Sequence, residues 1–249
     1  MRWKKKIKKW MIGVLIMSEI LTSTVLTACG SNDQRQKDAE KLLTDKYKEE
    51  FVVTSYDGQQ MMEDYYTVTA YAKSHPTLPF EANVTEDGTS VSDDYVSRRV
   101  CSAISEHISL NLSALPCTYY VHTGIMSGDS ICPDPNVSVE EFATKWEPYN
   151  RYYVYLYLSD EITKSGTQTG QVGSVLTKAL ADIPQIKGEL YVYVSDDEMI
   201  SKVHEYVESN TGLYDDYFQM TQEDHRGQFS FENGTVSISQ KDVDAIVKP

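Results

Sequence analysis

The sequence predicts an α+β protein in which a mixed, largely antiparallel sheet is layered with helices. Segments with strand and helix periodicity alternate between residues 118 and 209 of the 249-residue chain, which is typical of a sheet covered by helices. Both ends of the chain instead carry strand-like runs joined by short turns, and such turns favour antiparallel pairing. Together these patterns indicate α+β rather than a purely parallel α/β arrangement.

The first half of the chain is predicted to form a helix, three strands and a second helix. Apolar residues recur at helical spacing over residues 39–51, and β-branched and aromatic residues then dominate three short segments. The second helix, over residues 95–112, places Val96, Val100 and Ile104 on one face, with Ser92 or Asp93 as its N-cap. The three strand segments are FVVTSY (51–56), ended by an Asp57–Gly58 turn, YYTVTAYA (65–72), and PFEANVT (79–85), which runs into an Asp87–Gly88 turn.

The second half carries the strongest strand signals. RYYVYLYLS (151–159) is aromatic and apolar on both faces, so we expect it at the centre of a sheet, and Asn233–Gly234 is a strong hairpin signal. The remaining expected elements are a strand at 118–124, a helix at 139–146 with a Ser138/Glu141 capping box, a helix at 171–183, a strand at 189–194, a helix at 199–210 with a Ser195/Glu198 capping box, and a helix from Lys241.

Residues 1–28 are predicted to be a signal peptide. The basic segment MRWKKKIKKW precedes the apolar run Trp10–Met17, which is the order of a secretory signal. A membrane-spanning helix needs about 20 consecutive apolar residues, whereas Ser18 and Glu19 interrupt this run. A cleaved signal is therefore favoured over a permanent anchor.

The sequence Leu26-Thr27-Ala28-Cys29 resembles the lipobox of bacterial lipoproteins. The resemblance, which covers only the first 30 residues or so, implies transfer of diacylglycerol to Cys29 and cleavage before it. The mature chain would then be held on the extracytoplasmic face of the cell membrane, with the lipid bilayer as its partner through acylated Cys29. The heavily basic N-terminus and the short polar tether suit a Gram-positive host.

The mature chain is predicted to consist of a tether and a globular region. Residues 29–38 are short and polar, and are expected to link the lipid to the fold. Residues 39–249 form the α+β region, either as one domain or as two subdomains that divide near residue 115.

The charge balance restricts the class of partner. The full chain carries a formal charge of −14, and removal of residues 1–28 leaves 17 Lys and Arg against 36 Asp and Glu, a charge of −19. Such an acidic chain is unsuited to nucleic acid, because phosphate binding depends on Lys and Arg. Cationic, cell-wall or protein partners fit better.

Besides Cys29, the chain has three cysteines, Cys101, Cys117 and Cys132. An odd number leaves at least one outside any intramolecular bond. Cys117 and Cys132 flank a polar loop and are the favoured disulfide pair in an exported chain, with Cys101 and Cys117 as the alternative.

Two groups of residues are candidate interaction surfaces. Alternation in the strand 151–159 places Tyr153, Tyr155 and Tyr157 on one face, where they would form a stacking surface or, alternatively, pack in the core. The second group is acidic and lies beside Tyr214 and Tyr217, so it could receive a cationic group, although a solvated loop explains it as well. Its residues are Asp215, Asp216, Glu223 and Asp224.

No motif in the sequence specifies catalysis, a metal or a cofactor. There is no H-E-x-x-H, G-x-S-x-G or phosphate-binding loop, and Asp196, Asp197 and Glu198 are best explained by the start of a helix. The sequence thus predicts a non-catalytic binding or interaction protein without catalytic, metal or cofactor residues. The alternatives are a cell-wall hydrolase that uses paired carboxylates such as Glu223 and Asp224, and a small solute-binding protein.

Overall fold

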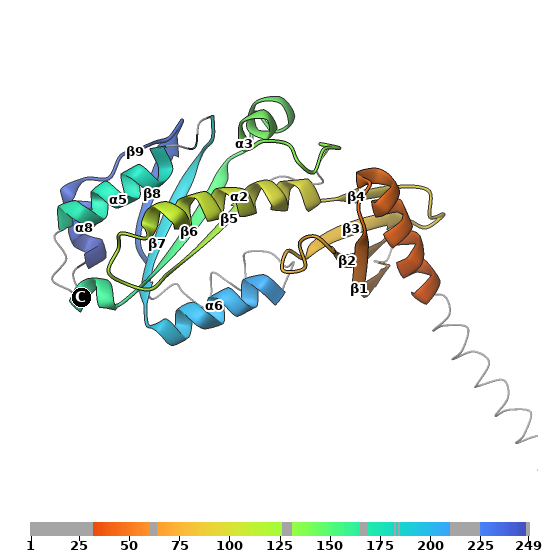
Figure 1. Cartoon of the computed structure of the whole chain (residues 1–249), viewed down its shortest axis with the longest axis horizontal. Helices are drawn as coiled ribbons and strands as arrows, with labels where there is room; N and C mark the ends of the chain where they lie inside the picture. Colours follow the sequence, from red (N-terminus) through yellow and green to blue (C-terminus); the bar gives the residue numbers. More distant parts are fainter. Residues whose placement is uncertain are drawn as a thin grey trace, which may run out of the picture.

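The computed structural model describes residues 32–59, 64–125, 131–164, 169–181, 183, 185–209 and 225–247. It contains two sheets, with a long helix, α2 (Tyr95–Leu112), between them in the chain (Figure 1). The first sheet is antiparallel throughout, and the second has one parallel strand pair. The predicted α+β class is confirmed, and its strands are divided over two sheets.

The first sheet has the strand order β1-β2-β3-β4. Inward and outward residues alternate along β2, where Tyr66 and Val68 are buried. β1 does not end at an Asp57–Gly58 turn as the sequence predicts: Gly58 has a φ of +86° and forms part of a β-bulge, so pairing continues to Gln59. The strands are β1 (Phe51–Gln59), β2 (Tyr65–Ala72), β3 (Phe80–Thr85) and β4 (Val91–Asp93).

An N-terminal helix packs on this sheet, and its described part covers residues 32–47. Residues 32–38, predicted as tether, are therefore helical. The Arg35 guanidinium lies 5.6 Å from the ring centre of Tyr56 and 5.1 Å from that of Tyr66, and the Tyr66 hydroxyl donates to the Arg35 carbonyl at 3.1 Å. The helix is thus docked from Arg35 onward.

A buried carboxylate joins this helix to the start of α2. Asp93, whose side chain is fully buried, accepts hydrogen bonds from Lys46 Nζ at 2.7 Å, the Tyr47 hydroxyl at 2.7 Å and the Tyr95 backbone N–H at 3.1 Å. Asp93 is the last residue of β4, and Asp94 occupies the N-cap position, so the predicted N-cap at Ser92 or Asp93 is wrong.

The second sheet has the strand order β5-β6-β7-β8-β9, with helices on both faces (Figure 1). As predicted for residues 151–159, β6 is internal and almost completely buried, between antiparallel β5 and parallel β7. Alternate residues of β6, such as Val154 and Leu156, face the core shared with α2, α5 and α8, whereas Tyr155 and Tyr157 face α6. The strands are β5 (Tyr119–Ile125), β6 (Tyr152–Ser159), β7 (Lys187–Ser195), β8 (His225–Glu232) and β9 (Thr235–Val236).

The helix ends and the last hairpin follow local chemistry. The Ser138 hydroxyl accepts from the Glu141 N–H at 3.1 Å, as predicted, whereas the cap before α6 is Asp196, which accepts from the Met199 N–H at 2.8 Å, and not Ser195. The hairpin at Asn233–Gly234 is confirmed. The remaining helices are α3 (Val139–Glu141), the π-helical turn η1 (Phe142–Trp146), α4 (Glu161–Lys164), α5 (Thr169–Ala181), α6 (Asp197–Ser209) and α8 (Gln240–Val247).

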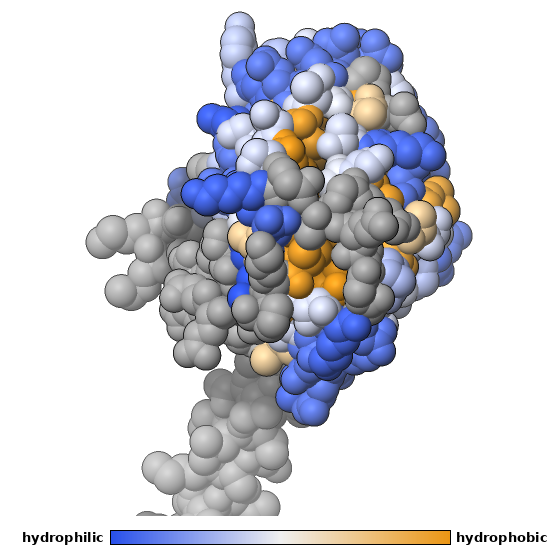
Figure 2. Space-filling view, turned by 90° about the vertical axis from the view of Figure 1, so that its left-hand side faces the viewer, coloured by the Kyte–Doolittle hydropathy of each residue, from blue (hydrophilic) through white to orange (hydrophobic). Residues whose placement is uncertain are grey.

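The described surface at the end that carries α5 and α8 is mainly hydrophilic and includes several hydrophobic areas (Figure 2). Among the described residues, no helix combines the length and apolar character that crossing a bilayer requires.

Candidate functional site

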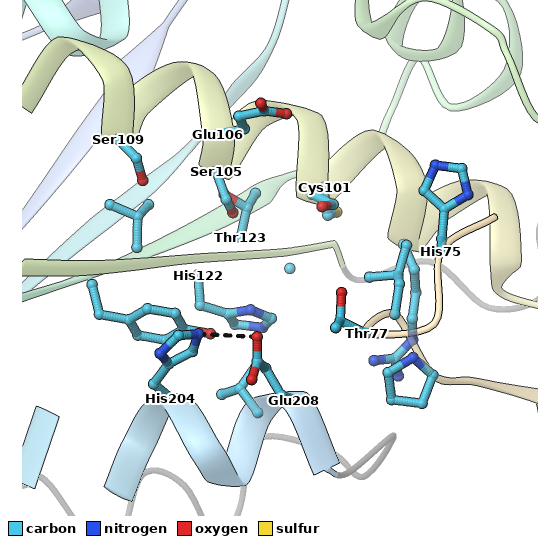
Figure 3. Close-up of a pocket in the computed structure, with 18 of the residues that line it drawn as sticks. His75, Thr77, Cys101, Ser105, Glu106, Ser109, His122, Thr123, His204 and Glu208 are labelled. Atoms are coloured by element: carbon cyan, nitrogen blue, oxygen red, sulfur yellow. Dashed lines mark hydrogen bonds and ion pairs between the residues drawn. The ribbon is translucent and has the colours of Figure 1, made fainter. Parts of the chain in front are cut away.

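A cleft of about 510 Å³ lies between α2, β5, the C-terminal part of α6 and the connection from β2 to β3 (Figure 3). β5 is the edge strand of the second sheet, and it forms the middle of the cleft. The two helices stand on either side of it, so the cleft collects side chains from four separate parts of the chain. The residues that carry the argument below are His75, Ser102, Glu106, His122, His204 and Glu208.

The wall made by α2 is polar, and most of its polar side chains are short hydroxyl groups. Arg98, Ser102, Ser105 and Ser109 recur at three- and four-residue spacing, which aligns them along one side of the helix. Small hydroxyl side chains keep the helix from filling the space beside β5. Ser105 also fixes the strand, because its hydroxyl donates to Thr123 Oγ1 at 2.9 Å.

The β5 strand contributes a histidine whose ring packs on a tyrosine of β6. His122 stacks on Tyr155, with 6.3 Å between ring centres and 22° between the ring planes. Burial, and secondarily the positive charge of Arg98, lower the pKa of His122 to about 4. The imidazole is therefore neutral at physiological pH, with one nitrogen that donates and one that accepts.

The α6 wall presents a half-exposed histidine. The His204 ring lies 4.5 Å from that of Tyr120, and its Nε2 lies 3.1 Å from Glu208 Oε1 (Figure 3). The side chains of His204 and Glu208 are 51% and 50% exposed, so both remain accessible from the cleft. Burial and the neighbouring Glu208 carboxylate raise the pKa of Tyr120.

The β2–β3 connection closes one end of the cleft with His75 and Thr77. His75 Nδ1 lies 2.8 Å from the Ser74 hydroxyl, and burial and the positive charge of Arg99 lower the pKa of His75. At this end of the cleft, as at His122, the surroundings therefore favour a neutral imidazole.

Protonation of His122 is expected to destabilise the fold in acid. Because the folded pKa is depressed from 6.5 to about 4, the stability contributed by neutral His122 is present above pH 6.5 and lost as the pH falls toward 4. Urea unfolding between these pH values should show the wild type losing about 2 kcal/mol more than His122→Gln, which does not titrate. Equal losses in both proteins would contradict this role of His122.

The structure brings Tyr153, Tyr155 and Tyr157 onto one face of β6, as their alternation predicts. However, Tyr155 and Tyr157 are only 2% and 1% exposed, and they pack with Ile200 and Val203 of α6. They therefore form core and not an open stacking surface; Tyr153 alone of the three is partly exposed. The expected acidic surface of Asp215, Asp216, Glu223 and Asp224 lies outside the described residues, as does Cys29.

The predicted disulfide between Cys117 and Cys132 is not formed, and Cys101, Cys117 and Cys132 are all thiols. Cys117 lies beside Ser159, whereas Cys132 contacts the carbonyl of Asp134 and lies near Tyr47. Cys101 does not pair with Cys117 either.

Within the described ranges, no cluster of three or more His, Cys, Asp or Glu side chains is arranged to hold a metal ion. The acidic run 196–198 has the capping role that the sequence predicts, because Asp196 caps α6 and the next two acids lie in its first turn.

The cleft itself was not predicted from sequence. His122 and His204 carry no motif, and 81 residues of chain lie between them, so the two meet only through the order of strands and helices. The one available signal was the position of His122 in TYYVHTG, a polar ring within an otherwise aromatic and apolar strand.

No protein-family model and no curated protein matches this sequence. Among solved structures, the chain is similar to the crystal structure of a DUF5037 family protein from Ruminococcus gnavus ATCC 29149. The TM-score is 0.59 at 17% sequence identity, and the match covers 85% of this chain and 98% of that chain. At this identity the similarity shows the fold alone, and it agrees with the α+β class.

Proposed function

We propose that this chain is a lipid-anchored, extracytoplasmic protein that binds a small polar ligand without transforming it. The signal-like N-terminus and the sequence Leu26-Thr27-Ala28-Cys29 support the anchor. The binding role rests on the cleft between α2, β5 and α6.

The volume and lining of this cleft carry the proposal. At about 510 Å³ it lies within the range of about 300–1,000 Å³ that small-molecule sites occupy. Rings from Tyr120 and His204 supply flat contact area, and hydroxyl, imidazole and carboxyl groups from Ser102, His75 and Glu106 supply hydrogen bonds. Such a mixture of a few convergent polar groups and aromatic surface is typical of a ligand site.

The binding role can be tested by filling the cleft. Soluble fragments from a bacterial cell-wall digest, titrated into the mature protein, should release heat with wild type and with Ala103→Trp. Ser102→Trp should weaken binding at least tenfold, because the indole would occupy space beside β5. Both positions are exposed on α2, but only Ser102 lines the cleft. Binding that is lost equally in both variants, or that neither variant affects, would exclude the cleft as the binding site.

A cell-wall hydrolase is the second candidate, because Glu106 and Glu208 line the same cleft from facing helices. Glycoside hydrolysis requires two carboxyl groups within about 5–10 Å of each other. Binding is favoured because one of these two carboxylates, that of Glu208, is already held by His204 on the same helix. Release of reducing ends that Glu106→Gln abolishes would instead establish hydrolysis.

The anchor is tested by mass. Membrane-extracted wild type should have the mass of residues 29–249 plus a diacylglycerol adduct, whereas Cys29→Ala should lack the adduct and retain residues 1–28. The reason is that acylation of the cysteine thiol precedes cleavage in the lipoproteins that this N-terminus resembles. An unmodified, full-length wild-type chain would contradict the proposed anchor.

A further inference from the structure

Two carboxylates that line the cleft, Asp94 and Glu208, already have a partner close in the chain, whereas Glu106 lies in the lining with an exposed side chain. Arg98 Nε lies 2.7 Å from Asp94 Oδ2, and His204 Nε2 lies 3.1 Å from Glu208 Oε1. An anionic ligand would face the carboxylates of Glu106 and Glu208, and the guanidinium of Arg98 is already paired with Asp94, so the ligand's charge would be left uncompensated, which is costly in a partly enclosed site. The electrostatics of the cleft therefore disfavour an anionic ligand, and the hydroxyl-bearing side chains of its lining favour an uncharged ligand over a cation.

The remaining polar groups suit hydroxyls. Ser102 and Thr77 are exposed at two sides of the cleft, and each hydroxyl can donate and accept hydrogen bonds. Glu106 adds an exposed carboxylate that can accept from two neighbouring hydroxyls. A ligand with many hydroxyl groups could satisfy both kinds of partner without bringing a charge.

The cleft also contains a flat ring with an accessible face. His204 lies 4.5 Å from Tyr120 between ring centres, and Tyr120 in turn lies 6.2 Å from Tyr157. This series of rings holds the half-exposed His204 in place, so that one face is supported by Tyr120 and the other is available. The apolar face of a sugar ring could pack flat against this open face of His204.

Resting on the binding role proposed above, we infer that the ligand is an uncharged glycan, with one sugar ring packed on His204 and its hydroxyl groups bound by Ser102, Thr77 and Glu106. The imidazole acts chiefly as a flat surface. Its replacement by another flat ring is therefore tolerated, whereas its removal is not.

The test uses three soluble probes of similar length: N-acetylated chitotetraose, which is uncharged, tetralysine and tetraglutamate. Binding is followed through the amide NMR shifts of Ser102, Ser109 and His204 in the mature protein. We expect the chitin fragment to shift all three amides. Its dissociation constant should rise about tenfold in His204→Ala, the upper range for one aromatic contact. His204→Phe should remain within about twofold of wild type, and so should Lys202→Ala, a matched change on the same helix outside the cleft.

The outcomes separate the glycan inference from the binding role. Cleft shifts with a charged peptide but not with the chitin fragment would overturn the glycan inference and leave the binding role standing. Equal weakening in His204→Phe and His204→Ala would overturn the packing role of the ring. Chitin-fragment binding that leaves the three cleft amides unchanged would overturn the inferred site. No cleft shift with any of the three probes, together with no heat from the cell-wall digest, would overturn both proposals.

Discussion

Gly188→Ala is expected to cost about 3 kcal/mol or more of the free energy of unfolding, a large part of the 5–15 kcal/mol that typical domains possess. A Cβ at this position would lie 1.8 Å from the Tyr152 carbonyl oxygen and 2.7 Å from its carbon. Both atoms belong to the backbone of β6, which pairs with β7 in parallel at this point. Neither strand can move without breaking the ladder at the centre of the sheet.

Urea unfolding followed by circular dichroism measures this loss. Gly88→Ala is the matched control, because Gly88 has a φ of +66° but open space around its Cα. The control should lose only about 1–2 kcal/mol, the cost of a left-handed backbone at a residue with a side chain. If Gly188→Ala were no less stable than Gly88→Ala, the close approach of β6 and β7 would not be a constraint.

Asp93→Ala is expected to cost about 3 kcal/mol, because it leaves the Tyr47 hydroxyl and the Tyr95 N–H without their buried acceptor and removes the partner of Lys46. Asp93→Asn should cost about 1 kcal/mol, since the amide oxygen can still accept from Tyr47 and Tyr95. The carboxyl also carries an electrostatic cost, because burial raises the pKa of Asp93 despite the nearby Lys46.

The sign of that shift gives a pH dependence. A carboxyl whose folded pKa is raised favours the folded state below its unfolded pKa, and this contribution is lost as the pH rises through the folded pKa. Stability of the wild type relative to Asp93→Asn should therefore decline as the pH rises from 4 through the folded pKa of Asp93. Denaturant midpoints at several pH values provide the measurement. A wild type that gains relative to the amide variant as the pH rises would show that Lys46 outweighs burial.

Much of the fold could be predicted because its signals are local. The alternation in β2, the continuous apolar character of β6 and the Asn233–Gly234 turn each act through the residues of one segment. The errors arose where tertiary contacts override local chemistry. Gly58 would suit a turn, but pairing with β2 makes it a bulge, and Asp93 would suit a helix cap, but burial against Lys46 and Tyr47 makes it the end of a strand.

The candidate site could not be predicted from the sequence because its parts are distant in the chain. His75, Ser102, His122 and His204 come from four elements, and only the order of the strands and the helices on either side of β5 brings them together. The alternation in the sequence predicts that Tyr153, Tyr155 and Tyr157 share one face of β6, but it does not show that α6 covers this face. The same limit explains why the disulfide prediction was wrong, since two cysteines that flank a loop in the sequence need not lie close together in the fold.

The docking of the N-terminal helix sets how far the protein could extend from a membrane. Arg35 is held by Tyr56 and Tyr66, so only six peptide steps separate this point from Cys29. Even a fully stretched chain of that length reaches only about 20 Å. An acylated Cys29 would thus keep the domain close to the lipid surface. Its ligands would then be limited to molecules that come within about one domain diameter of the bilayer.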